Sequence, residues 1–135
     1  MLCSFSVWTA GPAPIIGSVS VFEHGLVEVQ DSSNWVVISR LTPEQLEVVR
    51  SAVTGREFQE EVNRLSLEHP TPSCSDCAGI GVYYRADGYQ SSMDLSTEEV
   101  SAVLRSHLEK VDGVIREVFG RRYQFRLADG RWSSD

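Results

Sequence analysis

The pattern that most constrains how this chain folds is a pair of alternating segments on either side of Asp87-Gly88. Apolar side chains occupy every second position before and after this dipeptide: Ile80, Val82 and Tyr84, then Met93 and Leu95. Asp-Gly is a strong signal for a two-residue turn between antiparallel strands, because glycine tolerates positive φ. Such a turn pairs Val82 with Met93 and Ile80 with Leu95, which predicts a β-hairpin with one apolar face.

A second hairpin is predicted around Glu23-His24-Gly25, because valines alternate with polar residues on both sides of it. A two-residue turn would place Val21 opposite Glu28. A three-residue loop with Gly25 in the left-handed conformation instead places Val21 opposite Val27. We expect the three-residue loop, since it keeps the valines of both strands on one face.

Three more segments have the pattern of strands. Phe5 and Val7 alternate with serines, which predicts a short first strand. Residues 35–38 are an apolar run, Trp-Val-Val-Ile, typical of a central strand. A final strand is predicted where three apolar residues alternate with polar ones: Tyr123, Phe125 and Leu127.

Two helices are predicted in the middle of the chain. Thr42-Pro43-Glu44-Gln45 has the form of a capping box with proline in the first turn, and the helix is expected to end at Thr54-Gly55. Its expected buried face consists of Leu46, Val49 and Val53. A shorter helix follows, in which the apolar residues recur at helical spacing: Phe58, Val62 and Leu65.

A longer helix is predicted from about Thr97 to Phe119, because Ser96-Thr97-Glu98-Glu99 is a second capping box and Gly120 can stop the helix. An apolar stripe of 3.6-residue period supports it: Val100, Val103, Leu104, Val111, Val114, Ile115, Val118 and Phe119. Gly113 interrupts this helix at a cost of about 1 kcal/mol relative to alanine. A kink is therefore possible there.

Strands and helices occur in runs along the chain, which predicts the α+β class. We expect one domain over residues 1–135, with an antiparallel or mixed sheet of hairpins. A shorter helical segment and one long helix should pack on one face of that sheet. Residues 67–78 contain two prolines and two cysteines and are expected to form a loop, and the ends, about 1–4 and 129–135, are expected to be flexible.

The charge balance restricts the partners. Nineteen acidic and twelve basic side chains give a formal net charge of -7, which repels nucleic acid and anionic membranes. The same charge attracts a basic partner, and it also serves solubility. The longest apolar stretch, residues 10–21, is broken by proline and glycine and is shorter than the ~20 residues that span a bilayer. Because residues 1–8 lack the features of a signal peptide, we expect a cytoplasmic location.

Cys74 and Cys77 are the residues of this sequence best suited to metal binding or redox chemistry. Two thiolates with a two-residue gap can bind zinc, and His69 or Cys3 could supply further ligands. A structural zinc site usually has a second paired element, which this sequence lacks. A redox pair should open a helix, whereas a strand is predicted next. Free thiols or a local disulfide are the favoured interpretation, so we expect no cofactor, with zinc binding and redox chemistry as the alternatives.

No catalytic signature is present, and we expect no enzymatic activity. His24 is predicted in a hairpin loop and His107 on the polar side of the long helix, both in solvent. Gly79 and Gly81 lack the context of a nucleotide-binding loop and are interpreted as the entry to a strand. The adjacent pairs Glu60-Glu61 and Glu98-Glu99 point in different directions from their helices, which does not suit an acid/base dyad.

Tyr83 and Arg85 are the predicted binding residues. They alternate with Val82 and Tyr84 and must point away from the core, towards Ser92 and Gln90 across the hairpin. Such a composition is typical of protein interfaces, and a tyrosine packed under a neighbouring loop would give the same pattern.

The order of elements from Ile15 to Phe119, including the helix start Leu41-Thr42-Pro43-Glu44-Gln45-Leu46, resembles small bacterial domains of unknown function. In hydrophobic pattern and turn placement it is also similar to the emfourin type of protease inhibitor. The resemblance assigns no functional residue, and we do not associate the Cys74/Cys77 pair with emfourin. The expected function is a non-catalytic protein-binding module, such as a bacterial inhibitor or immunity protein. The alternative is a small metal-binding or thiol-redox protein centred on the two cysteines.

Overall fold

The computed structural model describes residues 1–8, 15–31, 36–70, 79–86, 89–123, 125–129 and 131–132. Its strands and α-helices follow one another in the order β1 (Cys3–Trp8), β2 (Ile15–Val21), β3 (Leu26–Asp31), β4 (Val36–Arg40), α1 (Pro43–Thr54), α2 (Arg56–Glu68), β5 (Gly79–Ala86), β6 (Tyr89–Ser96), α3 (Ala102–Phe119), β7 (Phe125–Arg126) and β8 (Arg131–Trp132). Short 3-10 turns cover Thr97–Glu99, Gly120–Arg122 and Leu127–Asp129.

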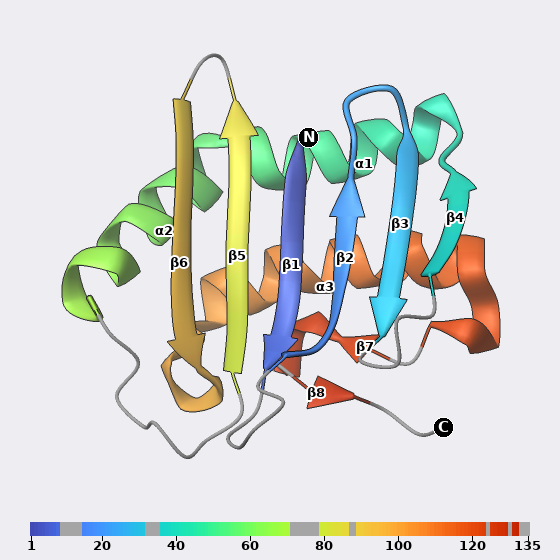
Figure 1. Ribbon diagram of the computed structural model, residues 1–135. Coiled ribbons are helices and arrows are strands. Elements are labelled where there is room, and N and C mark those ends of the chain that lie inside the picture. Colours follow the sequence, from blue (N-terminus) through green and yellow to red (C-terminus); the bar gives the residue numbers. More distant parts are fainter. Residues whose placement is uncertain are drawn as a thin grey trace.

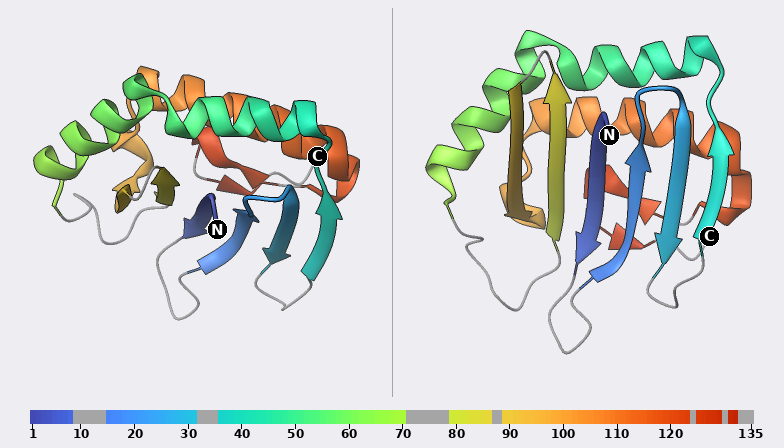
Figure 2. Two further views of the ribbon diagram at one scale, coloured as in Figure 1. Left: turned by 90° about the horizontal axis from the view of Figure 1, so that it is seen from above. Right: turned by 45° about the horizontal axis from the view of Figure 1, so that its top comes forward.

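The described strands form a six-stranded sheet in the order β4-β3-β2-β1-β5-β6 (Figure 1), and every neighbouring pair in it is antiparallel. All three α-helices lie on one side of this sheet, with α1 and α2 end to end and α3 beside them (Figure 2). The expected α+β fold with helices on one face is confirmed. The first strand, β1, lies in the interior of the sheet, between β2 and β5.

Both hairpins have the predicted register. Val82 lies opposite Met93 and Ile80 opposite Leu95 in the β5–β6 pair, in which Ala86 and Tyr89 are the last partners before the turn. Asp87 and Gly88 themselves lie outside the described residues. In the β2–β3 pair Val21 lies opposite Val27, and Gly25 has a φ of 94°, as the three-residue loop requires.

The core lies between the sheet and the helices. Alternate strand residues fill its lower layer: Cys3, Phe5, Val7, Val19, Val21, Val27, Val29, Ile80, Val82, Tyr84, Met93 and Leu95. The helices contribute an upper layer of apolar side chains: Val49, Ala52, Val53, Phe58, Val62, Leu65, Leu104, Leu108, Val111, Val114, Ile115 and Phe119. Phe58 and Tyr84 join the layers through an edge-to-face contact, with ring centroids 5.1 Å apart.

The capping box of α1 is present as predicted: Gln45 N donates to Thr42 Oγ1, and Thr42 N donates to the Gln45 side chain. The predicted start of the long helix is wrong. The capping box of Ser96 and Glu99 starts only a 3-10 turn, Val100 is extended, and α3 begins after a second N-cap, Ser101. Val103, expected on the apolar stripe, is partly exposed.

β4 is an edge strand and not the central strand that its apolar run predicted. Among the described strands it pairs with β3 alone, and its residues alternate between exposed and half-buried. Val36 is 45% exposed and Ile38 is 58% exposed, because none of the described helices covers the side of the sheet to which they point. Trp35, the first residue of the predicted strand, lies outside the described residues.

The final strand is also shorter than predicted. Tyr123, Phe125 and Leu127 are all buried, but of the described residues in this segment only Phe125–Arg126 form a strand, paired with Arg131–Trp132 in a separate small sheet. The carboxylate of Asp112 explains the interruption, because it accepts hydrogen bonds from the backbone N–H groups of Leu127 and Ala128 at 3.2 Å. Those two groups are therefore not available for a strand ladder.

Three boundaries of the expected flexible segments need correction. Cys3 and Ser4 belong to β1, where Cys3 is fully buried, so the expected flexible end over residues 1–4 is wrong. Leu67 and Glu68, expected in a loop, are the last turn of α2. Arg131–Trp132 is a strand within the end expected to be flexible. None of the described helices is long and apolar enough to cross a membrane.

Candidate functional site

The sheet has one face that no described helix covers, and we call it the open face (Figure 2). Alternation along the strands decides which side chains lie there. They are small or polar at most positions: Ser4, Ser6, Ser18, Ser20, Glu28, Gln30, Gly81, Tyr83, Arg85, Gln90, Ser92 and Asp94. The larger apolar ones are Trp8 at the end of β1, Leu26 at the start of β3, and Val36 and Ile38 on β4, where Arg40 also lies. A sheet with one solvated face is ordinary for an antiparallel architecture, so the composition of the face is what matters.

Tyr83 and Arg85 lie on this open face, as the sequence pattern predicted. Tyr83 is opposite Ser92 and half-buried, and its hydroxyl donates to the side chain of Gln90 at 3.3 Å. Arg85 is exposed, and no ion pair engages its guanidinium among the residues that the structure describes. Tyrosine and arginine are among the residue types that are enriched in binding hot spots.

Beside Tyr83, small serine side chains lie in a row across the two central strands, β1 and β2. Ser4 lies opposite Ser20, with their hydroxyl oxygens 3.1 Å apart, and Ser6 lies opposite Ser18. The row continues into β5 at Gly81, where a Cβ atom would lie 2.5 Å from the Ser6 hydroxyl. Small residues therefore leave the middle of the open face lower than its flanks, and a partner could approach the sheet closely there.

The open face is large enough to serve as an interface. Six strands at a spacing of about 4.8 Å, with about six residues each at 3.3 Å, give a face of roughly 24 by 20 Å. This projected area, on the order of 500 Å², is a large part of the ~800 Å² that each partner contributes to a standard interface.

The predicted metal or thiol site is placed only in part. Cys74 and Cys77 lie outside the described residues. Cys3 points into the core, where burial raises the pKa of its thiol to about 12, so it is a poor source of thiolate. His69 Nδ1 lies 2.7 Å from a carboxylate oxygen of Glu99. Within the described part of the chain, His, Cys, Asp and Glu do not gather in threes as a metal site would require.

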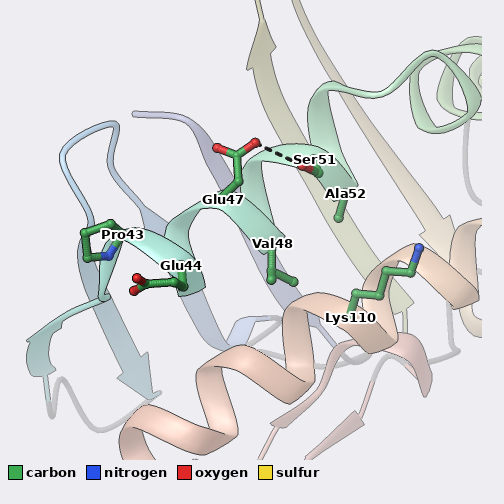
Figure 3. A pocket seen from close by; sticks show the side chains of 7 residues that line it. All are labelled: Pro43, Glu44, Glu47, Val48, Ser51, Ala52 and Lys110. Carbon is green, nitrogen blue, oxygen red and sulfur yellow. Dashed lines mark hydrogen bonds between the residues drawn. The ribbon is translucent and has the colours of Figure 1, made fainter.

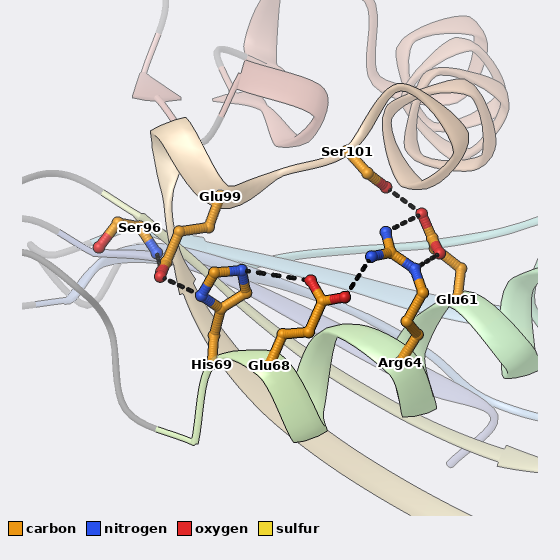
Figure 4. Close-up of polar contacts among 7 residues, drawn as sticks. All are labelled: Glu61, Arg64, Glu68, His69, Ser96, Glu99 and Ser101. Atoms are coloured by element: carbon orange, nitrogen blue, oxygen red, sulfur yellow. Dashed lines mark hydrogen bonds and ion pairs between the residues drawn. The ribbon is translucent and has the colours of Figure 1, made fainter.

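His69 belongs to a polar network at the end of α2 (Figure 4). His69 lies between Glu99 and Glu68, at 2.7 and 3.9 Å. The other oxygen of Glu68 accepts from Arg64 Nη1 at 2.8 Å. Arg64 also donates two hydrogen bonds to Glu61, at 2.7 and 2.9 Å. The chain of contacts thus connects the last turns of α2 with the segment that leads into α3.

The two buried carboxylates of this network, Glu61 and Glu99, fix the segment between β6 and α3 through hydrogen bonds. Glu99 accepts from the N–H of Ser96 at 2.8 Å, and Glu61 accepts from the hydroxyl of Ser101 at 2.5 Å. The Ser101 hydroxyl in turn accepts from Leu104 N as the N-cap of α3. The hydrogen bonds from Arg64 lower the pKa of Glu61 against the opposing effect of its burial. These contacts make the network a structural joint between α2 and α3.

The two predicted surface histidines differ in outcome. His24 is exposed in its hairpin loop, as expected. His107 is buried, so its predicted place in solvent is wrong: its ring packs edge-on against Phe58 at 5.7 Å, and Nε2 lies 3.0 Å from Glu57. The carboxylate pairs do diverge, since Glu60 is exposed beside Arg56 while Glu61 is buried.

Sequence reasoning missed Asp112, which lies on the buried face of α3 between Leu108 and Ile115. Its carboxylate accepts a hydrogen bond from the hydroxyl of Tyr123 at 2.6 Å and one from each of two backbone N–H groups. Burial raises the pKa of Asp112 despite these hydrogen bonds. The sequence did contain a signal for its burial: Asp112 is four residues after Leu108 and three before Ile115, so all three lie on the same face of α3.

The fold and the open face together define a class of protein: a small α+β domain with one antiparallel sheet, covered by helices on one side only. No protein-family model matches the chain, and a comparison with curated proteins finds no match. The surfaces of the molecule itself are therefore the basis for inferring its function.

Proposed function

We propose that this chain is a non-catalytic protein-binding module that engages a partner protein through the open face of its sheet, in the manner of an inhibitor or immunity protein. One observation carries the proposal: Tyr83 and Arg85 stand together on a broad sheet face that no described element covers. Removal of aromatic and arginine anchors from an interface commonly costs about 2 kcal/mol or more, whereas the same side chains in solvent contribute little.

The test is a comparison of immobilised baits in extract of the native organism. The wild-type protein should retain a partner that Tyr83→Ala with Arg85→Ala loses. The matched control is Arg56→Ala with Leu67→Ala, which removes an arginine and a large apolar side chain that are exposed on α2. The control bait should retain the partner. Equal retention by all three baits would show that the open face is not the interface.

A metal or thiol protein centred on Cys74 and Cys77 is the competing function. Of its four expected side chains, Cys3 is a buried thiol and His69 is engaged with Glu99. Metal analysis and thiol titration of purified protein separate the two functions, together with the variant Cys74→Ser, Cys77→Ser. We expect no stoichiometric zinc and a nearly unchanged Tm in the variant. Zinc in the wild type and loss of the fold in the variant would replace our proposal.

A further inference from the structure

The helical layer is hollowed along the seam between α1 and α3 (Figure 3). Two hollows of about 740 and 350 Å³ lie there, and both are lined by Glu44, Val48 and Lys110. They therefore form one groove, which we call the α1–α3 groove. Its lining on α1 extends from Pro43 to Ala52, a distance of roughly 13 Å at 1.5 Å per residue. The groove lies on the helical side of the molecule, opposite the open face.

The floor of the groove is apolar. Val48 points from α1 towards α3 and is 44% exposed, which makes it one of the few large hydrophobic side chains in solvent among the described residues. Ala52, one turn further along α1, and Val114 on α3 also line the floor, but both are buried, so Val48 supplies most of its accessible apolar surface. Accessible apolar surface at the bottom of a groove favours an occupant with apolar side chains of its own.

Gly113 is the second observation that points to an occupant. A glycine inside a helix costs about 1 kcal/mol relative to alanine. The fold gives no reason for that cost: Gly113 is exposed, its φ is not positive, and an added Cβ would meet no atom within 4 Å. Its missing side chain does keep the groove open beside Val48. A residue that lowers stability without a structural reason is typical of a functional site.

Charge indicates the chemistry of the occupant. The groove is lined by the carboxylates of Glu44, Glu47, Glu109 and Glu117 and by one ammonium group, Lys110. Glu47 contacts Arg50 at 4.0 Å, and Glu117 accepts from Gln45 at 3.2 Å. Among the described residues, no ion pair uses Glu44 or Glu109. An apolar floor between carboxylates, two of which have no ion pair among the described residues, complements a segment that carries both apolar and basic side chains.

We infer that the α1–α3 groove is a docking site for a basic amphipathic helix of a partner protein. An apolar side chain of that helix would fill the space over Gly113 beside Val48, and its lysines or arginines would pair with Glu44 and Glu109. The lined length accommodates about two and a half turns of a helix. This site is distinct from the open face, so the inference does not depend on the proposed function.

The first experiment maps binding on the intact protein by NMR. The probe is a 14-residue helical peptide of leucine and lysine with leucine at i, i+3, i+4 and i+7, and its counterpart carries glutamate in place of lysine. The lysine peptide should shift the amide signals of residues 43–52 and 109–117, and the glutamate peptide should not. Shifts spread over the whole acidic surface, or centred on the open face, would overturn the inference.

Two pairs of variants make the test specific. Gly113→Gln fills the groove and should weaken binding at least tenfold, whereas Gly113→Ala, with a similar helix propensity, should stay within about threefold of the wild type. Glu44→Gln with Glu109→Gln should also weaken binding at least tenfold. Glu28→Gln with Glu60→Gln makes the same change in net charge on other surfaces and should have a small effect. Equal effects within either pair would show that the groove is not the site.

The open-face variant keeps the two proposals separate. Tyr83→Ala with Arg85→Ala should bind the lysine peptide as the wild type does. If this variant alone failed to bind the lysine peptide, the peptide would bind the open face, and the α1–α3 groove would not be its docking site.

Discussion

Glu61 and Asp112 are both buried carboxylates, but the environment shifts their pKa values in opposite directions. Glu61 accepts hydrogen bonds from a guanidinium and a hydroxyl, which favour its charged form. Asp112 accepts from neutral donors in a more enclosed place, and its burial dominates. A charged donor is what separates the two cases, since hydrogen bonds that involve an ionised group are the stronger ones.

Glu61→Gln should lower the free energy of unfolding by about 1 to 2 kcal/mol at pH 7, because the charged pair with Arg64 is lost. Since the folded-state pKa of Glu61 is lowered, its contribution is present above the unfolded pKa of about 4.5 and is lost as the pH falls through the folded value. Urea denaturation across a pH series should therefore show the two proteins converging in acid. The exposed neighbour is the control, and Glu60→Gln should change stability by less than about 0.5 kcal/mol.

Asp112→Asn should show the opposite trend. The raised folded-state pKa of Asp112 means that the folded protein gains protons at a higher pH than the unfolded chain. Its contribution to stability is therefore fully present below the unfolded pKa of about 3.8 and is lost as the pH rises through the folded value. The asparagine variant lacks this titration, so the stability of the wild type relative to the variant should increase as the pH falls from 7 to 4. A constant difference in urea titrations would contradict the assignment.

At the scale of single elements, Gly113 allows a direct test of what limits α3. Gly113→Ala should raise the free energy of unfolding by about 0.5 to 1 kcal/mol, because the helix is continuous there and the added methyl group meets nothing. Thermal and urea denaturation measure the change. A loss of stability would mean that the backbone at this position needs glycine.

The elements that sequence could predict are those with local causes. Gly25 and its three-residue loop determine one register, and the alternation before and after residues 87 and 88 determines the other. Thr42 and Gln45 cap α1 by themselves. The side of the sheet that carries Tyr83 follows from the same alternation, so the predicted part of the candidate site depended on local pattern alone.

The elements that sequence missed depend on contacts between distant residues. The start of α3 moves to Ser101 because Glu61, forty residues earlier, accepts its hydroxyl hydrogen bond. His107 has the helical spacing of Leu104 and Val111, but its polarity suggested solvent until α2 was known to cover it. The α1–α3 groove arises only when two helices pack, and its one early signal was the unexplained Gly113.

At the scale of the whole molecule, the two-stranded β7–β8 unit contacts the main sheet at Gly17, against which Phe125 packs. A Cβ on Gly17 would lie 2.0 Å from Cζ of the buried Phe125 and 2.6 Å from the carbonyl oxygen of Gln30. Gly17→Ala should therefore destabilise the protein by about 1 to 3 kcal/mol, through overpacking. Denaturation in urea gives the value.

A second substitution shows whether the ring is the cause. Phe125→Leu shortens the side chain that faces residue 17, so in the Gly17→Ala background it should recover part of the lost stability. The same leucine in the wild-type background should cost stability, because it leaves a cavity. If the alanine variant were as stable as the wild type, the C-terminal unit would not be held in the way that the structure indicates.

The position of β1 has a consequence for how this molecule is made. Cys3 pairs on one side with Val21, which follows shortly, but on the other side with Tyr84, which the ribosome adds some eighty residues later. During synthesis β1–β4 can form a meander whose β1 edge has no neighbour, and the helices have only four of the six strands on which to pack. Closure waits for β5, a contact of long sequence separation that should make folding slow. Until then, the exposed edge of β1 is where a nascent chain is open to mispairing with another copy.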